Sequence, residues 1–215
     1  MPIVNAQQMK ACDHYTIETI GIPAMVLMER AALAVYHEVT AHQKYDLSHV
    51  LIVTGSGNNG GDGYAIARLL HLAQIPVTIW QASSLDHATK ECAQQVAICQ
   101  HYPIPCLDTL TDFSSYTLII DAFLGIGVST KLRKGTCQVI DAINQSRVPV
   151  VAVDLPSGID ASTGDSLGCH ITAQTTVTFQ FEKTAFHKHP GKEAAGTVIL
   201  ADVGISDEPL VTEIS

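Results

Sequence analysis

Residues 50–64 read VLIVTGSGNNGGDGY, an apolar run that passes directly into a stretch containing five glycines. The run at 50–53 has the length and the β-branched composition of a buried strand. Helical spacing of apolar residues begins at Asp62 and continues to Ala73. A strand, a glycine-rich turn and a helix in this order form the first half of a βαβ unit, which predicts a parallel sheet.

The same alternation of short apolar runs and amphipathic stretches continues along the chain. Helices are predicted at 87–99 and 135–145, and Pro76, Pro103 and Pro149 each mark the passage from a helix into the next strand. Apolar runs such as VPVVAVD are typical of strands covered by helices on both faces, so we predict a doubly wound α/β fold. The further predicted strands are 77–80, 104–107, 118–121, 148–154, 176–181 and 197–201.

Ahead of the sheet, residues 6–44 carry two helical patterns separated by TIGIPAM, in which Gly21 and Pro23 stop one helix and start the next. We expect residues 1–45 to form a helical cap. The apolar face of its second helix, from Met25 to Val35, packs on the domain in our interpretation, and a second copy of the chain is the alternative. The whole of 1–215 is predicted to be one domain, whose polar end at 206–215 either frays or leads to another domain.

Composition narrows the classes of partner and compartment. The chain is 47% apolar and 15% charged, with a net charge of −9, which argues against a nucleic-acid or anionic-membrane partner. Its longest apolar runs are too short to span a bilayer. The six cysteines show no C-x-x-C pairing and the first residues show no secretory signal, so we expect reduced thiols in the cytoplasm. Helical spacing makes Cys92 and Cys99 small core residues in our interpretation.

Three loops that follow predicted strands combine glycine with a carboxylate. They lie at 54–63, 121–127 and 154–160. Because ligands of doubly wound sheets bind beyond the carboxyl ends of the strands, we expect these loops to form the site together.

The first loop matches the pattern G-x-G-x-x-G at Gly55, Gly57 and Gly60, but its surroundings do not fit the usual dinucleotide mode. The end of the next strand carries Trp80 and Gln81 where that mode requires an acid for the ribose. Gly61 stands where a Walker loop requires lysine. Neither standard nucleotide loop therefore explains this stretch.

The polar residues of the first loop allow more than one role. Its glycines would let backbone N–H groups at a helix start approach an anion such as a phosphate. Asp62 is either a helix cap or a ligand contact, and Asn58 and Asn59 either support a left-handed turn or contribute oxygens. Carboxylate and amide oxygens so close together also permit a bound cation.

Asp121 and Asp154 each end an apolar strand, where a carboxylate must be hydrogen-bonded, paired or shifted in pKa. Each is a candidate general acid or base, with capping of the following turn as the alternative. Ser157 in LPSGI lacks the pattern of a nucleophile elbow. Lys183 follows another strand at the same edge, where it either meets an anion or is a solvated surface residue.

The ten histidines do not predict a transition-metal site, since they are scattered singly apart from His187 and His189. These two are interpreted as part of a solvated turn before Pro190.

Taken together, GSGNNGGDGYAIARLL, IIDAFLGIGVS, VVAVDLPSGIDASTG and the stretch from TVTFQFEK to ADVGI resemble the NAD(P)H-hydrate epimerase family, the YjeF amino-terminal domain. The similarity extends from GIPAMVLMERAA to ADVGI, about nine-tenths of the chain. It implies a Rossmann-like three-layer αβα sandwich with a mostly parallel sheet, typically dimeric. It also implies interconversion of the R and S epimers of NADHX and NADPHX, which a partner dehydratase would then use.

The resemblance also implies roles for particular residues. Asp154 would contact the substrate, and we take it as the proton-transferring group. Potassium would be held by Asn59, Asp121 and Ser157. The other predicted substrate-binding residues are Asn58, Asn59, Gly60, Gly61, Asp62, Gly125, Ile126, Gly127, Val128, Ser129, Thr130 and Lys131.

Three positions depart from the family pattern: Ser56 replaces a usual proline, Ile126 a usual threonine, and Glu182 the proline of a Pro-Lys pair. Ile126 removes one hydroxyl from the expected ligand contacts. Two alternatives stay open at this point. One is a non-catalytic dinucleotide-binding or dimerising scaffold of the same fold, and the other is that the chain is a piece of a bifunctional epimerase and dehydratase.

Overall fold

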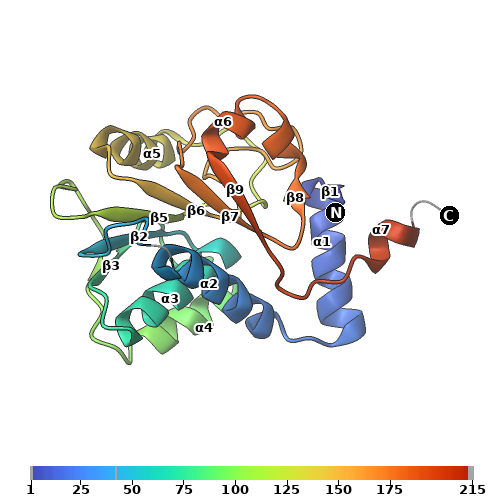
Figure 1. Cartoon of the computed structure of the whole chain (residues 1–215), viewed down its shortest axis with the longest axis horizontal. Coiled ribbons are helices and arrows are strands. Elements are labelled where there is room, and N and C mark those ends of the chain that lie inside the picture. Colours follow the sequence, from blue (N-terminus) through green and yellow to red (C-terminus); the bar gives the residue numbers. More distant parts are fainter. Residues whose placement is uncertain (1, 42, 213–215) are drawn as a thin grey trace.

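The computed structural model describes residues 2–41 and 43–212, and within them the main sheet has seven strands, all parallel. Its order is β4-β3-β2-β5-β6-β7-β9 (Figure 1). Every strand predicted in the main sheet is confirmed, with ends that differ by a few residues. The bounds are β2 Val50–Thr54, β3 Val77–Gln81, β4 Cys106–Leu107, β5 Leu118–Ala122, β6 Val150–Val153, β7 Thr175–Phe179 and β9 Thr197–Ala201.

Helices cover both faces of this sheet, which gives the predicted three layers. Figure 1 shows α2, α3 and α4 on one face and α5 and α6 on the other. Alternate residues of β2 enter separate cores: Val50 and Ile52 on the first face, Leu51 and Val53 on the second. The helices span α2 Ala24–Ala41, α3 Asn58–Leu72, α4 Lys90–Cys99, α5 Lys134–Ser146 and α6 Gly191–Ala195.

The strand order reverses at β2, because the chain adds β3 and β4 on one side and β5, β6, β7 and β9 on the other. At such a reversal the connections leave on opposite faces, and a crevice opens beyond the carboxyl ends of the two central strands. The loops after β2, β5 and β6 therefore meet at one edge, as the sequence predicted.

The cap consists of α1 Ala6–His14, which continues as the π-helical turn Tyr15–Ile20, and of α2. The predicted break is confirmed at Gly21, whose φ of 87° suits glycine. Leu27, Ala31 and Val35 are buried, and α2 packs on α3 and β7, so this face belongs to the core of the same chain.

A second, two-stranded parallel sheet was not predicted. It pairs β1 Ile3–Val4 with β8 Glu182–Lys183 and so ties the start of α1 to the segment after β7. The short helices Thr184–His187 and α7 Glu208–Thr212 complete the chain, and α7 packs against α1. The predicted polar end is thus helical at 208–212, while 213–215 lie outside the described residues. Within residues 2–41 and 43–212, no helix has both the length and the apolar content to cross a bilayer.

The expected start of the first sheet-covering helix is wrong. Helix α3 begins at Asn58, four residues before Asp62, and its N-cap is Gly57. Asn58 and Asn59 are therefore helical rather than left-handed. The glycines serve close packing, since a Cβ on Gly60 would lie 2.1 Å from the carbonyl oxygen of Gly55 and one on Gly61 would meet the Met28 side chain at 2.6 Å.

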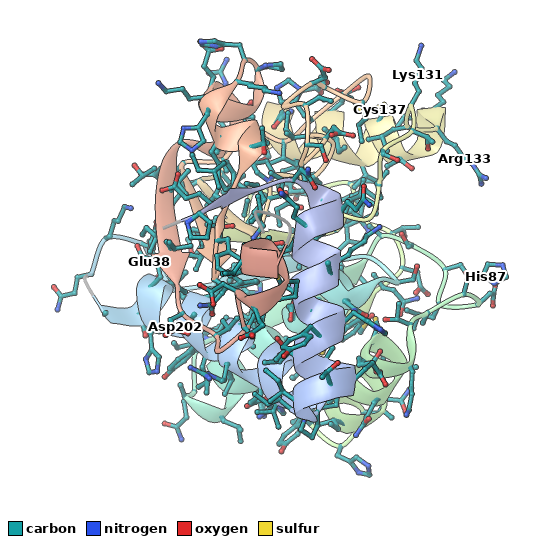
Figure 2. All side chains as sticks on the ribbon, turned by 90° about the vertical axis from the view of Figure 1, so that its right-hand side faces the viewer. Glu38, His87, Lys131, Arg133, Cys137 and Asp202 are labelled. Carbon is teal, nitrogen blue, oxygen red and sulfur yellow. A yellow bond between two sulfur atoms is a disulfide. The ribbon has the colours of Figure 1, made fainter. Side chains whose placement is uncertain are left out.

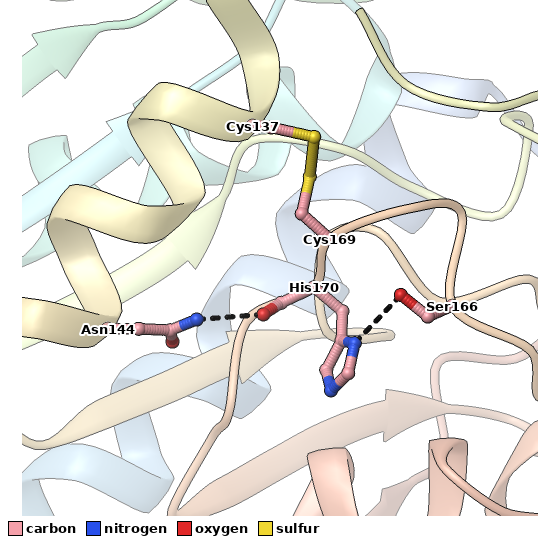
Figure 3. The surroundings of a disulfide bond; sticks show 5 residues. All are labelled: Cys137, Asn144, Ser166, Cys169 and His170. Carbon is pink, nitrogen blue, oxygen red and sulfur yellow. Dashed lines mark hydrogen bonds between the residues drawn. A yellow bond between two sulfur atoms is a disulfide. The ribbon is translucent and has the colours of Figure 1, made fainter. Parts of the chain in front are cut away.

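The expectation that all cysteines are reduced is also wrong. Cys137 of α5 and Cys169 form a disulfide (Figure 3), whereas Cys92 and Cys99 are free, buried core residues as predicted. The pairing depends on the loop after β6 folding back across α5, where Asn144 Nδ2 donates to the His170 carbonyl at 2.8 Å. Cysteine spacing carries no sign of that return path.

Because α3 lies close to its own preceding loop, we predict that alanine substitution affects stability differently at two helical glycines. Gly60→Ala should destabilise the protein by at least about 2 kcal/mol, because the methyl group meets rigid backbone. Gly135→Ala in α5 should be neutral or stabilising by up to about 1 kcal/mol, because a Cβ there meets nothing within 4 Å. Urea unfolding of both variants measures this, and equal stabilities would contradict the packing described.

Candidate functional site

A cavity of about 520 Å³ lies at the switch edge of the sheet. All three predicted loops line it: Asn58 and Asp62 after β2, Phe123 after β5, and Asp154 after β6. The cap supplies a further wall with Met9, Lys10, Asp13, Ile17, Leu27, Met28 and Ala31, and other elements add residues such as Glu91, Phe179, Val203 and Ile205. The expected convergence of the loops is present, and the cap adds a wall to the crevice.

The start of α3 presents amides and an acid to the cavity, and its glycines pack instead. Asn58, Asn59 and Asp62 line the space, whereas Gly60 and Gly61 do not. Near the helix start, the N–H of Gly61 is already bonded to the Gly57 carbonyl at 3.1 Å. The unbonded donors of the first turn are therefore those preceding Gly61, which is where an anionic group would bind.

Asp121 joins two of the loops. Its Oδ1 accepts the Ser157 hydroxyl at 2.6 Å and the Phe123 N–H at 3.2 Å, and its Oδ2 accepts the Ser157 N–H at 2.8 Å. Burial raises the pKa of Asp121 to about 6, while the Ser157 and Phe123 hydrogen bonds act against that rise. The side chain caps its own turn and clamps the neighbouring one, which is the structural alternative weighed for it.

Asn59 reaches the same point from α3. Its Nδ2 donates to the Leu124 carbonyl at 2.9 Å, and the Leu124 N–H donates to Ser157 Oγ at 2.8 Å. Asn59 Oδ1 is buried and has no hydrogen-bond partner among the described residues. Asn59, Asp121 and Ser157 are thus gathered around the backbone of Leu124, with one oxygen left to bind something else.

Asp154 adopts a left-handed backbone conformation with φ 64°, which costs a non-glycine residue about 1–2 kcal/mol. Its Oδ1 accepts the Thr178 hydroxyl at 3.1 Å, the Phe179 N–H at 3.2 Å and the ammonium of Lys183. No described residue donates to Oδ2, which leaves that oxygen for the cavity. The hydrogen bonds to Oδ1 accompany this strained backbone, and the Asp154 side chain lines the cavity.

Lys183 has no exposed surface. Besides Asp154, its Nζ donates to the Thr178 hydroxyl at 2.8 Å and to the Phe179 carbonyl at 3.1 Å. The solvated alternative for this lysine is therefore wrong. An ammonium this deeply buried requires a charged partner, and Asp154 supplies it.

Asp62 does not cap its helix, since α3 begins four residues earlier at Asn58, with Gly57 as its N-cap. Its side chain is buried on the cavity wall, and no described residue donates to it. Burial raises the pKa of Asp62 well above its ordinary value, and the negative charges of Asp154 and Asp13 raise it further. Of the two roles weighed for it, the helix cap is wrong, and Asp62 lines the cavity instead.

Asp13 is the site residue that sequence reasoning missed. Burial raises its pKa to about 6, the charge of Asp154 adds to that rise, and Lys183 opposes it. The available signal was an acid between Met9 and Ile17 on one helical face, since all three line the cavity. The sequence could have revealed Asp13, because an acid between apolar residues on one helical face is unusual.

The predicted binding segment 125–131 is only partly at the cavity. Gly125, Ile126, Gly127 and Val128 line it, whereas Ser129, Thr130 and Lys131 are exposed outside it. Figure 2 shows Lys131 and Arg133 extending away from the body of the protein. Ile126, which replaces the usual threonine, packs its side chain against two of the apolar cores.

The predicted solvated turn at His187 and His189 carries two surface pairs, in which His187 contacts Glu182 at 2.8 Å and His189 contacts Glu193 at 3.3 Å. In the described part of the chain no three His, Cys, Asp or Glu side chains are grouped as metal ligands.

An acid-lined cavity at the switch point of a doubly wound sheet defines a Rossmann-like α/β protein with an enclosed ligand site. A model of the family described as YjeF-related protein N-terminus matches residues 24–185, and the chain belongs to this family. A relative from Limosilactobacillus reuteri, 48% identical over 93% of this chain and 94% of its own length, is named NAD(P)H-hydrate epimerase. A relative of the same name from Oenococcus oeni is 40% identical over 94% of this chain and 96% of its own length.

The solved structure of the yeast protein ynu0 shares the fold, with a TM-score of 0.76. It is 23% identical and the match covers 90% of this chain and 86% of that one. At this identity the similarity concerns the architecture alone. It confirms the predicted three-layer αβα sandwich.

The burial of Asp62 predicts a stability that depends on pH in a definite direction. Because its pKa is raised in the folded state, folding favours the protonated acid, and this contribution is lost as pH rises from the ordinary value of 3.8 through the raised one. Asp62→Asn should therefore raise Tm near pH 8, by about 2–4 °C for each kcal/mol of relieved penalty, and change it little near pH 4.

The control for this measurement is Asp108→Asn, which changes an exposed acid and should leave Tm unaltered at both values. Calorimetry of the three proteins over this pH range gives the comparison. A Tm of Asp62→Asn that equals wild type at alkaline pH would show that the carboxylate is not penalised by its burial.

Proposed function

We propose that this chain is an NAD(P)H-hydrate epimerase, an isomerase that interconverts the R and S epimers of NADHX and NADPHX. Relatives that are 40–48% identical over almost the whole chain carry this name. The observation that carries the proposal is the Asp154 carboxylate, which lies on the cavity wall and is paired with the buried Lys183. A non-catalytic scaffold of the same fold has no need of that arrangement.

The substrate would bind along the start of α3 and the loop after β5. Asn58, Asn59 and Asp62 line the cavity from one side and residues 125–128 from the other, which supports the predicted contacts. Gly60 and Gly61 would act by letting α3 approach its neighbours closely, and the exposed segment 129–131 would reach the outer part of the ligand. The unbonded N–H groups before Gly61 would bind a phosphate of the substrate.

The reaction exchanges the two faces of the hydroxyl-bearing ring carbon. It can open and reclose the bond between that carbon and the ring nitrogen, or lose water and regain it on the opposite face. Both routes require a proton to leave or reach the oxygen, and we assign that transfer to Asp154. A positioned acid or base of this kind contributes about 10²–10⁴-fold to a rate.

Potassium is the cation proposed for the cluster of Asn59, Asp121 and Ser157. The orphaned Asn59 Oδ1 and the carboxylate and hydroxyl beside it are oxygen donors, which is the chemistry an alkali cation requires. When bound, the ion would supply positive charge near the anionic substrate. The protein's own part is to hold these three groups around Leu124.

We also propose the wider setting that the family resemblance implies. The chain would act as a single domain over 1–215, with 1–45 as its cap, and as a homodimer in the cytoplasm. Its product would pass to an S-specific NAD(P)HX dehydratase. The Cys137–Cys169 disulfide is unusual for that compartment.

Asp154→Asn tests the assigned chemistry. Because the amide cannot accept the proton, the rate of R-NADPHX conversion should fall by about 100-fold or more, measured with an S-specific dehydratase as coupling enzyme. Asp141→Asn changes an exposed acid on α5 and serves as the matched control, with unchanged activity. Undiminished conversion by Asp154→Asn would remove this residue from the chemistry.

Potassium binding has a readout that does not depend on turnover. KCl should raise the Tm of the wild-type protein above its value in the same concentration of choline chloride, because a ligand of the folded state stabilises it. Asn59→Leu, which lacks the orphaned oxygen, should lose that difference. Identical melting of wild type in the two salts would argue against the site.

A further inference from the structure

We propose that Asp13 of the cap is a second catalytic residue, which exchanges a proton with the substrate in the cavity that Asp154 also lines. This inference rests on the proposed epimerase function and names a further group that performs it.

The position of Asp13 follows from how the cap is attached. Strand β1 pairs with β8 so that Val4 lies beside Lys183, and the Ala6 N–H donates to Ser162 Oγ at 3.0 Å in the loop after β6. Helix α1 therefore begins next to the Asp154–Lys183 pair and runs across the edge of the sheet (Figure 1). Asp13, two turns further along, lines the same cavity as Asp154 but from a different element.

The two carboxyl groups differ in their partners. Asp154 receives three donors, one of them the buried ammonium of Lys183. Among the described residues no group donates to the carboxyl of Asp13. One acid is thus paired with a cation and held by hydrogen bonds, and the other is free to reorient toward a ligand. A proton donor and a proton acceptor in one site require this difference.

Burial, together with the charges around it, favours the protonated form of Asp13 below about pH 6. The pKa of Asp13 is raised to about 6, first by burial and then by the charge of Asp154, while Lys183 lowers it. Asp62 also faces this space, nine-tenths buried and with no donor to its carboxyl among the described residues. Lys10 of α1 and Glu91 of α4 also line this cavity. His14 on α1, Glu18 on the π-helical turn and Glu208 on α7 are further titratable groups of the elements packed along α1.

The pair completes a ring-opening route without any further reactant. Asp154 takes the hydroxyl proton as the bond between the carbon and nitrogen breaks. The bonding electrons go to the nitrogen, which receives the proton of Asp13, and the oxygen becomes a carbonyl. After rotation of the open chain, nitrogen attacks the other face of the carbonyl carbon, returns a proton to Asp13, and the oxygen recovers its proton from Asp154.

Asp13→Asn tests the assignment with R-NADPHX and the S-specific dehydratase, after subtraction of the uncatalysed rate. We expect kcat to fall by about 100-fold, with Tm and the stabilisation by NADP retained. Glu18→Gln, an exposed acid on the continuation of α1, is the matched control and should keep full activity. Wild-type activity is measured first, since its absence would overturn the epimerase function itself.

An active wild type together with Asp13→Asn activity within about threefold of it would overturn the role of Asp13 alone. If Asp13→Asn does not fold, the dependence of kcat/KM on pH decides. A proton donor acts only while protonated, so wild-type kcat/KM should fall as pH rises through about 6. Asp13→Glu should remain active with a displaced midpoint of that fall, and an unmoved midpoint would overturn the proposal.

Discussion

The ion pair between Lys183 and Asp154 is the interaction on which the site depends. A fully buried ammonium has to be paired, and Lys183 achieves this with Asp154, the Thr178 hydroxyl and the Phe179 carbonyl. The pair holds Asp154 in its left-handed conformation at the end of β6. It also fixes β8, which in turn positions β1 and the start of the cap.

The rest of the site carries an excess of acid. Asp13, Asp62 and Asp121 each have a raised pKa, chiefly because burial disfavours their charged forms, and Lys183 is already committed to Asp154. Such a site is under electrostatic strain without protons or a cation. Binding of a proton or a cation would relieve this repulsion, so the cavity favours both.

Much of the fold was predictable because its signals are local. Apolar runs located every strand of the main sheet, and Gly21 with Pro23 located the break in the cap. The start of α3 was misjudged because its glycines look like a loop, whereas they are small so that the helix can approach Gly55 and Met28. The disulfide between Cys137 and Cys169 depends on a loop returning across α5, which spacing does not report.

The sequence by itself determined the parallel sheet and the placing of Asp62, Asp121 and Asp154 at one edge, because strand periodicity and the ends of apolar runs are properties of neighbouring residues. Only the tertiary structure decided which acids cap turns and which line the cavity. It also brought Asp13 into the cavity, through a pairing of β1 with β8 that joins residues far apart in the chain. Burial and charge pairing depend on contacts between residues that are distant in the sequence, so only the folded structure reveals them.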